Sequence, residues 1–186
     1  MFCMQHIPVL RQSVQQFLNL HPGDIAVDCT VGLGGHFSDI LGSVAAKGFA
    51  YGFDQDLSHI NYTREKLKDL QNNFQLFHAN FSELHEYLAA ENIDQVDGIL
   101  FDLGLASPHV DTPERGFSFL KDGPLDMRFD RSSGSSFSQS FTAADIVNGF
   151  SFSQLEHIFR EYGEERFARN IAHAIVHDRR QKPFRT

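Results

Sequence analysis

Short apolar runs alternate with segments of helical length over residues 25–102, and this alternation is the strongest constraint on the fold. The apolar runs, each short enough for a buried strand, are 25–30, 49–54, 74–79 and 96–102. The segments between them have the length and apolar spacing of helices: 37–46, 58–70 and 82–90. Ser82 is expected to cap the last of these. Another helix is expected to begin near Pro8. Such alternation predicts an α/β fold, a parallel sheet with helices on both faces.

A glycine-rich turn follows the first predicted strand, at the edge of the sheet where ligands bind in such folds. Its sequence is Gly32-Leu33-Gly34-Gly35-His36, and its backbone N–H groups could closely approach a phosphate or a carboxylate. A plain tight turn is the alternative. Phe37 stands where a dinucleotide fingerprint has its third glycine, and no Gly-Lys-Ser/Thr follows as in a P-loop.

Three more residues at the predicted strand ends are candidates for binding or catalysis. Asp54 ends the second strand, where an acid can accept hydrogen bonds from ribose hydroxyls, although a solvated loop acid, which neighbouring Asp56 could also be, is the alternative. Phe81 follows the third strand and could stack on an adenine ring or belong to the core. Asp102 ends the fourth strand and could orient an amine and take its proton, or instead cap a loop or bind a ligand's amine.

The character of the sequence changes after Gly104, and we expect residues 1–104 and 105–186 to form separate units. Prolines and glycines between positions 108 and 124 predict a long structured loop, and the Ser-rich stretch 131–141 is typical of a flexible segment. The acids of the loop could suggest a cation site, but Arg115 and Arg128 favour a salt-bridged loop, and no metal site is predicted.

Capping patterns predict that the rest of this second unit is helical. Thr142 with Asp145 and Ser153 with Glu156 each resemble the start of a helix. A last helix is expected over 164–180, with apolar residues on one stripe. We expect a core followed by a helical region and no further clear strand.

The net charge of −8 is unevenly distributed. From Arg160 onward seven Lys and Arg residues accompany four acids, so the preceding residues carry the whole negative excess. The acidic body argues against nucleic-acid binding through charge alone, whereas the basic C-terminal helix could contact RNA phosphates or simply be solvated. The two cysteines follow no metal or disulfide spacing, and no signal peptide or apolar span is visible, which is typical of a cytoplasmic protein.

A series of motifs resembles the MraW/RsmH family, the bacterial S-adenosylmethionine (SAM)-dependent methyltransferases of ribosomal RNA cytosine N(4). The motifs occur in order as HIPVL at 6–10, DCTVGLGGH at 28–36, GFDQD at 52–56, DGILFDLG at 97–104, PERGFSF at 113–119, DGPLDMR at 122–128 and YGEERFA at 162–168. The loop from Pro113 to Arg128 is the most specific part, because no general rule of folding requires it. The resemblance covers nearly the whole chain.

The resemblance implies a Rossmann-like core that binds SAM. Gly34, Gly35 and His36 would hold the methionine end of the cofactor. Asp54 would bind the ribose, and Phe81 would contact the adenosine part. The implied RNA substrate belongs to the small ribosomal subunit.

The resemblance also implies roles for two later residues. Asp102 would lie beside both the cofactor and the target amine, as the catalytic residue. His109 occupies a cofactor-contacting position where the family usually has glutamine; imidazole can also donate a hydrogen bond, but it is shorter and titratable. The family's enzymes are much longer, so we expect a truncated chain whose helical region is a partial, substrate-facing insertion domain.

The reaction that we expect is direct methyl transfer to the exocyclic amine of an unstacked cytosine. An NAD-dependent oxidoreductase is disfavoured by the missing third glycine and by the lack of a recognisable hydride-transfer site. A truncated, catalytically inactive module that binds SAM or a nucleotide is the other alternative. The sequence leaves the oligomeric state open.

Overall fold

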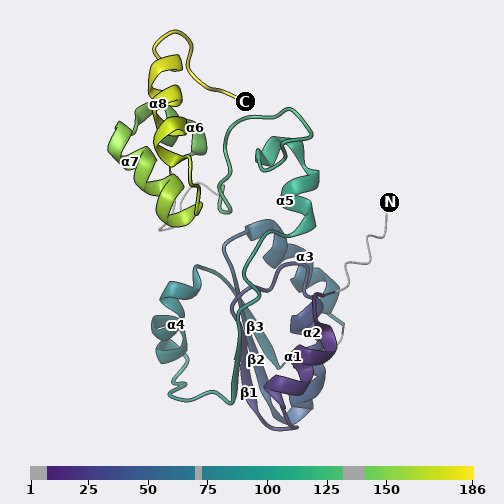
Figure 1. Cartoon of the computed structure of the whole chain (residues 1–186). Coiled ribbons are helices and arrows are strands. Elements are labelled where there is room, and N and C mark those ends of the chain that lie inside the picture. The colour runs from purple at the N-terminus through teal and green to yellow at the C-terminus, as the bar shows by residue number, and fades with distance from the viewer. Residues whose placement is uncertain (1–7, 70–72, 132–140) are drawn as a thin grey trace. The chain divides into compact units, whose positions relative to one another are not determined.

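Residues 8–69, 73–131 and 141–186 are described by a computed structural model of the chain (Figure 1). The chain divides into two compact units, Met1–Gly104 and Leu105–Thr186. The Ser-rich stretch 131–141 lies almost entirely outside the described residues, as does Leu70 at the expected end of the helix 58–70. No helix among the described residues is long and apolar enough to cross a membrane.

The four apolar runs of the first unit form one parallel sheet. Its strands are β1 (Ile25–Asp28), β2 (Phe49–Asp54), β3 (Phe74–His78) and β4 (Gly98–Leu100), in the order β3-β2-β1-β4. All three pairings are parallel, so the carboxyl ends of the strands share one edge. This confirms the predicted α/β class.

Helices cover both faces of this sheet, as expected. They are α1 (Arg11–Leu18), α2 (Gly35–Val44), α3 (Leu57–Leu67) and α4 (Leu84–Ala90), with the short 3-10 helices η1 (Ala45–Lys47) and η2 (Phe81–Glu83). In Figure 1, α4 lies on one side of the sheet and α1, α2 and α3 lie on the other. The helix predicted near Pro8 begins at Arg11.

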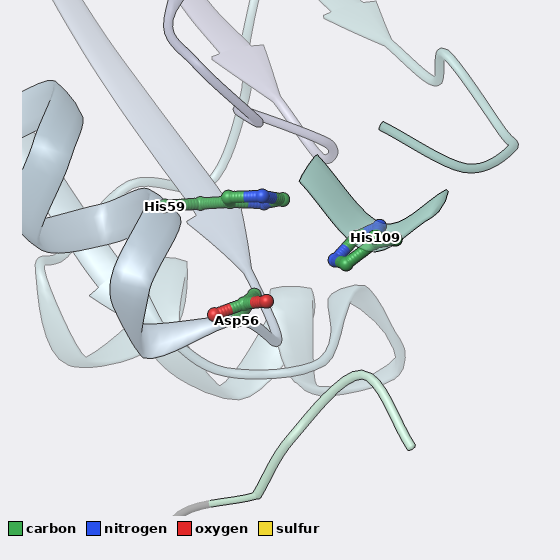
Figure 2. Close-up of side chains that lie close together, drawn as sticks. All are labelled: Asp56, His59 and His109. Atoms are coloured by element: carbon green, nitrogen blue, oxygen red, sulfur yellow. The ribbon is translucent and has the colours of Figure 1, made fainter. Parts of the chain in front are cut away.

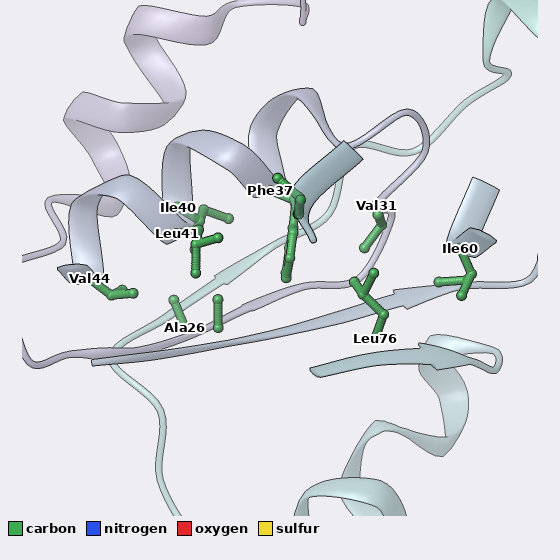
Figure 3. Close-up of a cluster of buried hydrophobic side chains, with 10 residues drawn as sticks. Ala26, Val31, Phe37, Ile40, Leu41, Val44, Ile60 and Leu76 are labelled. Atoms are coloured by element: carbon green, nitrogen blue, oxygen red, sulfur yellow. The ribbon is translucent and has the colours of Figure 1, made fainter. Parts of the chain in front are cut away.

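Alternation of side chains along the strands divides the core into two clusters, one on each face. Ala26 and Ala50 belong to the first cluster, whereas their neighbours Val27 and Tyr51 belong to the second, as the two-residue period of a strand requires. Figure 3 shows the first cluster, in which Phe37 is fully buried. The Phe37 ring also packs edge-to-face on Phe74, at a centroid distance of 5.9 Å. Burial of one such ring contributes about 2 kcal/mol.

Two helix starts in the first unit differ from the sequence prediction. Asp56 is not a solvated acid: it is 4% exposed, and its carboxylate accepts a hydrogen bond of 2.9 Å from the Ser58 amide, which caps α3. Asn80 rather than Ser82 caps the segment after β3, because its side-chain oxygen accepts the Ser82 amide at 2.8 Å. Aspartate and asparagine at these positions satisfy amides that a helix start leaves without partners.

The described part of the second unit is helical and contains no strand. Its elements are α5 (Ser107–Asp111), η3 (Pro113–Arg115), α6 (Ala143–Gly149), α7 (Phe152–His157), a π-helical turn η4 (Ile158–Tyr162) and α8 (Ala168–Asp178). The helix expected over 164–180 is therefore shorter at both ends. Glu164, which lies before α8, has a left-handed backbone conformation (φ 48°) that does not fit a right-handed helix.

One of the two capping patterns of this unit is confirmed and the other is wrong. The Thr142 hydroxyl accepts the Asp145 amide at 3.1 Å, as predicted. The next helix is capped by Ser151, whose hydroxyl accepts the Gln154 amide at 3.4 Å, and not by Ser153. The sequence contains both patterns in overlap, and Glu156 instead pairs with Arg160 one turn later, at 2.5 Å.

The expected salt bridge of the loop is confirmed at Arg128, which pairs with Asp126. Arg128 Nη2 lies 2.9 Å from Asp126 Oδ2, and these hydrogen bonds lower the pKa of Asp126. Arg115 donates to the carbonyl oxygens of Arg128 (3.1 Å) and Phe129 (2.8 Å). Arg115 and Arg128 thus hold the loop together through contacts with other residues of the same loop.

Substitution of Gly52 should destabilise the first unit. A Cβ at Gly52 would lie 2.6 Å from side-chain atoms of both Leu76 and Val31, so Gly52→Ala should lower the free energy of unfolding by about 1–3 kcal/mol through overpacking. Gly42 lies inside α2 with nothing within 4 Å of a new Cβ. Gly42→Ala should therefore raise the free energy of unfolding by about 0.5–1 kcal/mol. Urea denaturation of both variants measures this; equal effects would contradict the packing argument.

Candidate functional site

The glycine-rich turn joins the end of β1 to the start of α2. Gly34 has a φ of 70°, a left-handed conformation that glycine adopts without strain, and α2 begins at the next residue. The Val31 amide donates to Phe53 O at 3.0 Å and the Gly34 amide to Val31 O at 2.8 Å. The first amides of α2 have no intrahelical acceptor, so this helix start can receive an anionic group.

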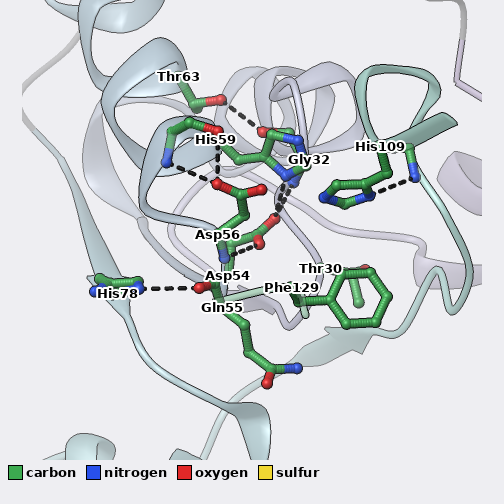
Figure 4. Close-up of polar contacts among 12 residues, drawn as sticks. Thr30, Gly32, Asp54, Gln55, Asp56, His59, Thr63, His78, His109 and Phe129 are labelled. Atoms are coloured by element: carbon green, nitrogen blue, oxygen red, sulfur yellow. Dashed lines mark hydrogen bonds and ion pairs between the residues drawn. The ribbon is translucent and has the colours of Figure 1, made fainter. Parts of the chain in front are cut away.

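Asp54, at the end of β2, is hydrogen-bonded to that turn (Figure 4). Its Oδ2 accepts the Gly32 amide at 2.7 Å, and its Oδ1 accepts the Asp56 amide at 2.8 Å. The side chain is 14% exposed. The carboxylate is therefore held in one orientation beside the turn, which fits the ribose-binding role predicted for it.

His59 is a further member of this cluster that the sequence prediction missed. It lies near Asp56 at the start of α3 (Figure 2), is 3% exposed, and its Nδ1 lies 3.2 Å from Asp54 Oδ2. A proton on Nδ1 makes this a hydrogen bond to the carboxylate. The five-residue separation of His59 from Asp54 was the available signal, since it places the histidine in the first turn of the helix after the acid.

Thr30 connects the ends of β1 and β4. Its hydroxyl oxygen accepts the Asp102 amide at 2.8 Å, and its own amide donates to Asp28 Oδ1 at 2.9 Å. Asp28 is fully buried, and burial raises its pKa to about 7, with the Thr30 hydrogen bonds opposing the shift and the charges of Asp54 and Asp102 adding to it. Three carboxylates thus meet at the strand ends.

His36 lies in the first turn of α2 and faces Asp102. Its Nε2 is 3.7 Å from Asp102 Oδ2, and the imidazole is 7% exposed whereas the Asp102 side chain is 48% exposed. Neither ring nitrogen of His36 has a hydrogen-bond partner among the described residues. Such buried nitrogens are costly unless a ligand or water satisfies them. Asp102 remains accessible to a substrate.

The remaining predicted site residues have separate surroundings. The Phe81 ring is partly buried against the second core cluster and contacts Phe101 edge-on at a centroid distance of 5.4 Å. His109 belongs to the second unit, where its ring packs against Phe117 and Phe129 and its Nδ1 accepts the Ala106 amide at 3.2 Å. If neutral, His109 therefore carries its proton on Nε2.

The first unit thus brings the glycine turn, Asp54 and Asp102 to one edge of a parallel sheet. Comparison of the whole sequence with known families identifies the family to which the chain belongs. A family model described as the MraW methylase family matches residues 3–186. The chain belongs to the MraW methylase family.

Curated relatives agree with this membership. Ribosomal RNA small subunit methyltransferase H of Mycoplasma mycoides is 46% identical over 175 residues, which cover 94% of this chain and 55% of the relative. The protein of the same name from Caldicellulosiruptor saccharolyticus is 47% identical over 182 residues, covering 98% of this chain and 57% of the relative. The chain spans about half the length of these relatives.

A solved structure described as a putative rRNA-methylase from Clostridium thermocellum is also similar. It is 28% identical, with a TM-score of 0.46, and the match covers 55% of this chain and 57% of that one.

The buried Asp28 should make stability fall as pH rises. Its pKa is higher in the folded state (about 7) than its ordinary value of 3.8, so the folded protein binds the proton more tightly, and this contribution is lost between those two pH values. Asp28→Asn removes the titration, so the stability of the variant relative to the natural chain should be greater at pH 8 than at pH 4.5. Urea denaturation at both pH values measures the difference, and a pH-independent difference would show that Asp28 does not titrate in this range.

Proposed function

We propose that this chain binds S-adenosylmethionine and serves in methylating the exocyclic amine of a cytosine in small-subunit ribosomal RNA. The observation that carries the proposal is the 2.7 Å hydrogen bond between the Gly32 amide and the Asp54 carboxylate. It places a helix start suited to a carboxylate beside an acid suited to a ribose. The names of the MraW-family relatives supply the substrate class, ribosomal RNA of the small subunit.

The residues present fit the parts of this cofactor. The amides at the start of α2, including those of Gly35 and His36, would receive the methionine carboxylate. Asp54 would accept hydrogen bonds from the ribose hydroxyls, and Phe81 would contact the adenosine part. The two buried ring nitrogens of His36, which have no hydrogen-bond partner in the described part of the chain, support a ligand at this position. From the second unit, we propose His109 as a further contact.

Asp102 is the proposed catalytic residue. A bound SAM supplies a methyl carbon activated by its sulfonium, so the protein has to supply position and a proton acceptor. The Thr30 hydroxyl fixes the backbone of Asp102 by accepting its amide hydrogen bond. The half-exposed carboxylate of Asp102 can then accept a hydrogen bond from the target amine. That hydrogen bond would orient the nitrogen lone pair, and the carboxylate would take up the amine proton as the N–C bond forms and the C–S bond breaks.

The second unit, residues 105–186, is the proposed RNA-facing part. It contains the basic C-terminal stretch, whose charge suits phosphate contacts better than the acidic remainder of the chain. The target cytosine has to leave its stack to reach a buried cofactor. An RNA substrate in the ribosomal small subunit also makes the cytoplasm the expected compartment.

Cofactor binding is tested by calorimetric titration with SAM. The natural chain should bind it saturably, and Asp54→Asn should weaken binding by about tenfold or more, because charge-assisted hydrogen bonds to the ribose are lost. Asp94→Asn, at an exposed acid on the same unit, is the matched control and should bind normally. Binding of NAD instead of SAM, or no binding by a folded chain, would contradict the proposal.

Catalysis is tested separately with labelled SAM and small-subunit RNA. Asp102→Asn should bind SAM within a few-fold of the natural chain but transfer the methyl group about a hundredfold more slowly, because the proton acceptor is gone. Scintillation counting of the RNA measures the transfer. If the natural chain binds SAM but transfers nothing, the alternative of a cofactor-binding module without activity is favoured.

A further inference from the structure

Helix α3 packs directly behind the glycine-rich turn. Thr63 is fully buried, and its hydroxyl donates to the Gly32 carbonyl oxygen at 3.1 Å (Figure 4). A Cβ at Gly34 would lie only 2.7 Å from Thr63 Cγ2. The turn therefore rests on this helix with no space between them.

Lys66, one helical turn after Thr63, contacts the same turn. Its Nζ donates to the carbonyl oxygens of Leu33 at 3.0 Å and Gly34 at 3.3 Å. The Ser38 hydroxyl also donates to Gly34 O, at 2.5 Å. The carbonyl oxygens of residues 32–34 are thus all engaged by side chains of α2 and α3, which leaves amides at the start of α2 to face a ligand.

Lys66 also brings positive charge to a site rich in acids. Asp28, Asp54 and Asp102 lie at the strand ends of this unit, and each disfavours an anionic ligand group. The acid within α2, Asp39, accepts a hydrogen bond of 2.6 Å from Arg11 Nε, and its charge also acts on the Lys66 ammonium. Among the described residues, the hydrogen bonds of the Lys66 ammonium go to carbonyl oxygens, and its charge can act on a ligand at the other side of the turn.

We infer that Lys66 is a positioning residue that makes the site selective for cofactors with a free carboxylate. It holds the turn carbonyls of Leu33 and Gly34 away from the ligand and places a positive charge behind the amides that receive the carboxylate. This inference rests on the proposed SAM-binding function. Thr63 supports the turn mechanically, since its hydroxyl carries no charge, and so contributes to affinity without selecting for the carboxylate.

Two ligands that differ by one carboxylate test this inference. S-adenosylhomocysteine carries the carboxylate, and S-adenosyl-3-thiopropylamine lacks it but keeps the amine, thioether and adenosine. Dissociation constants are measured by calorimetry on the full chain. Lys66→Met should weaken binding of the first ligand about three- to tenfold more than binding of the second, the effect of one charge acting across a turn near the protein surface. Lys66→Arg, which keeps the charge, should retain most of the selectivity.

Two further variants distinguish the effect of the Lys66 charge from mechanical support of the turn. Lys68→Met removes an exposed lysine at the end of the same helix and should affect neither ligand. Thr63→Val keeps the shape of the side chain but loses the hydrogen bond to Gly32, so it should weaken both ligands by the same factor.

The outcomes distinguish the inference from the proposed function. If Lys66→Met weakens both ligands equally, Lys66 only supports the fold and the inference is wrong, while the proposed cofactor site stands. If the natural chain binds both ligands with equal affinity, the carboxylate selectivity is absent and the inference is again wrong. If the folded natural chain binds neither ligand, both the inference and the proposed function fail.

Discussion

The hydrogen bond from the Gly32 amide to the Asp54 carboxylate joins two segments that are separated by 22 residues and an entire helix. It is possible because β1 and β2 are parallel neighbours, with Asp28 opposite Gly52, so both chains leave the sheet at the same edge. The bond fixes the acid against the turn, and the Asp56 amide holds its second oxygen. The start of α2 and the start of α3 are therefore positioned by one carboxylate.

Charge is the second constraint on this edge of the sheet. Burial of Asp28 raises its pKa to about 7, and the nearby charges of Asp54 and Asp102 add to this shift. Backbone amides stabilise two of these acids, since Asp28 accepts from Thr30 and Asp54 from Gly32. Asp102, the most exposed of the three, has a different environment, with His36 at 3.7 Å. The three carboxylates thus lie in different surroundings, which suit them to different roles.

The sequence predicted the class of fold and most of its elements, and local patterns explain why. The apolar runs and amphipathic segments reflect periods of two and 3.6 residues, which are properties of neighbouring positions. Where two local patterns overlapped, the prediction failed: Ser151 and Ser153 both have a polar residue three positions later, and pairing of Glu156 with Arg160 left Ser151 as the cap. The sequence could not distinguish the cap Asp56 from a solvated loop acid, because a helix start and a loop look alike in sequence.

The sequence by itself determined the alternation of strands and helices, the glycine turn, the acids at the strand ends and the motifs of the MraW methylase family. Only the tertiary structure decided which of these groups touch. It paired His36 with Asp102 and set Thr63 and Lys66 behind the turn. These contacts depend on strand order, register and the packing of α3 on the sheet. Spacing along the chain does not carry that information, because it records only what lies within a few residues.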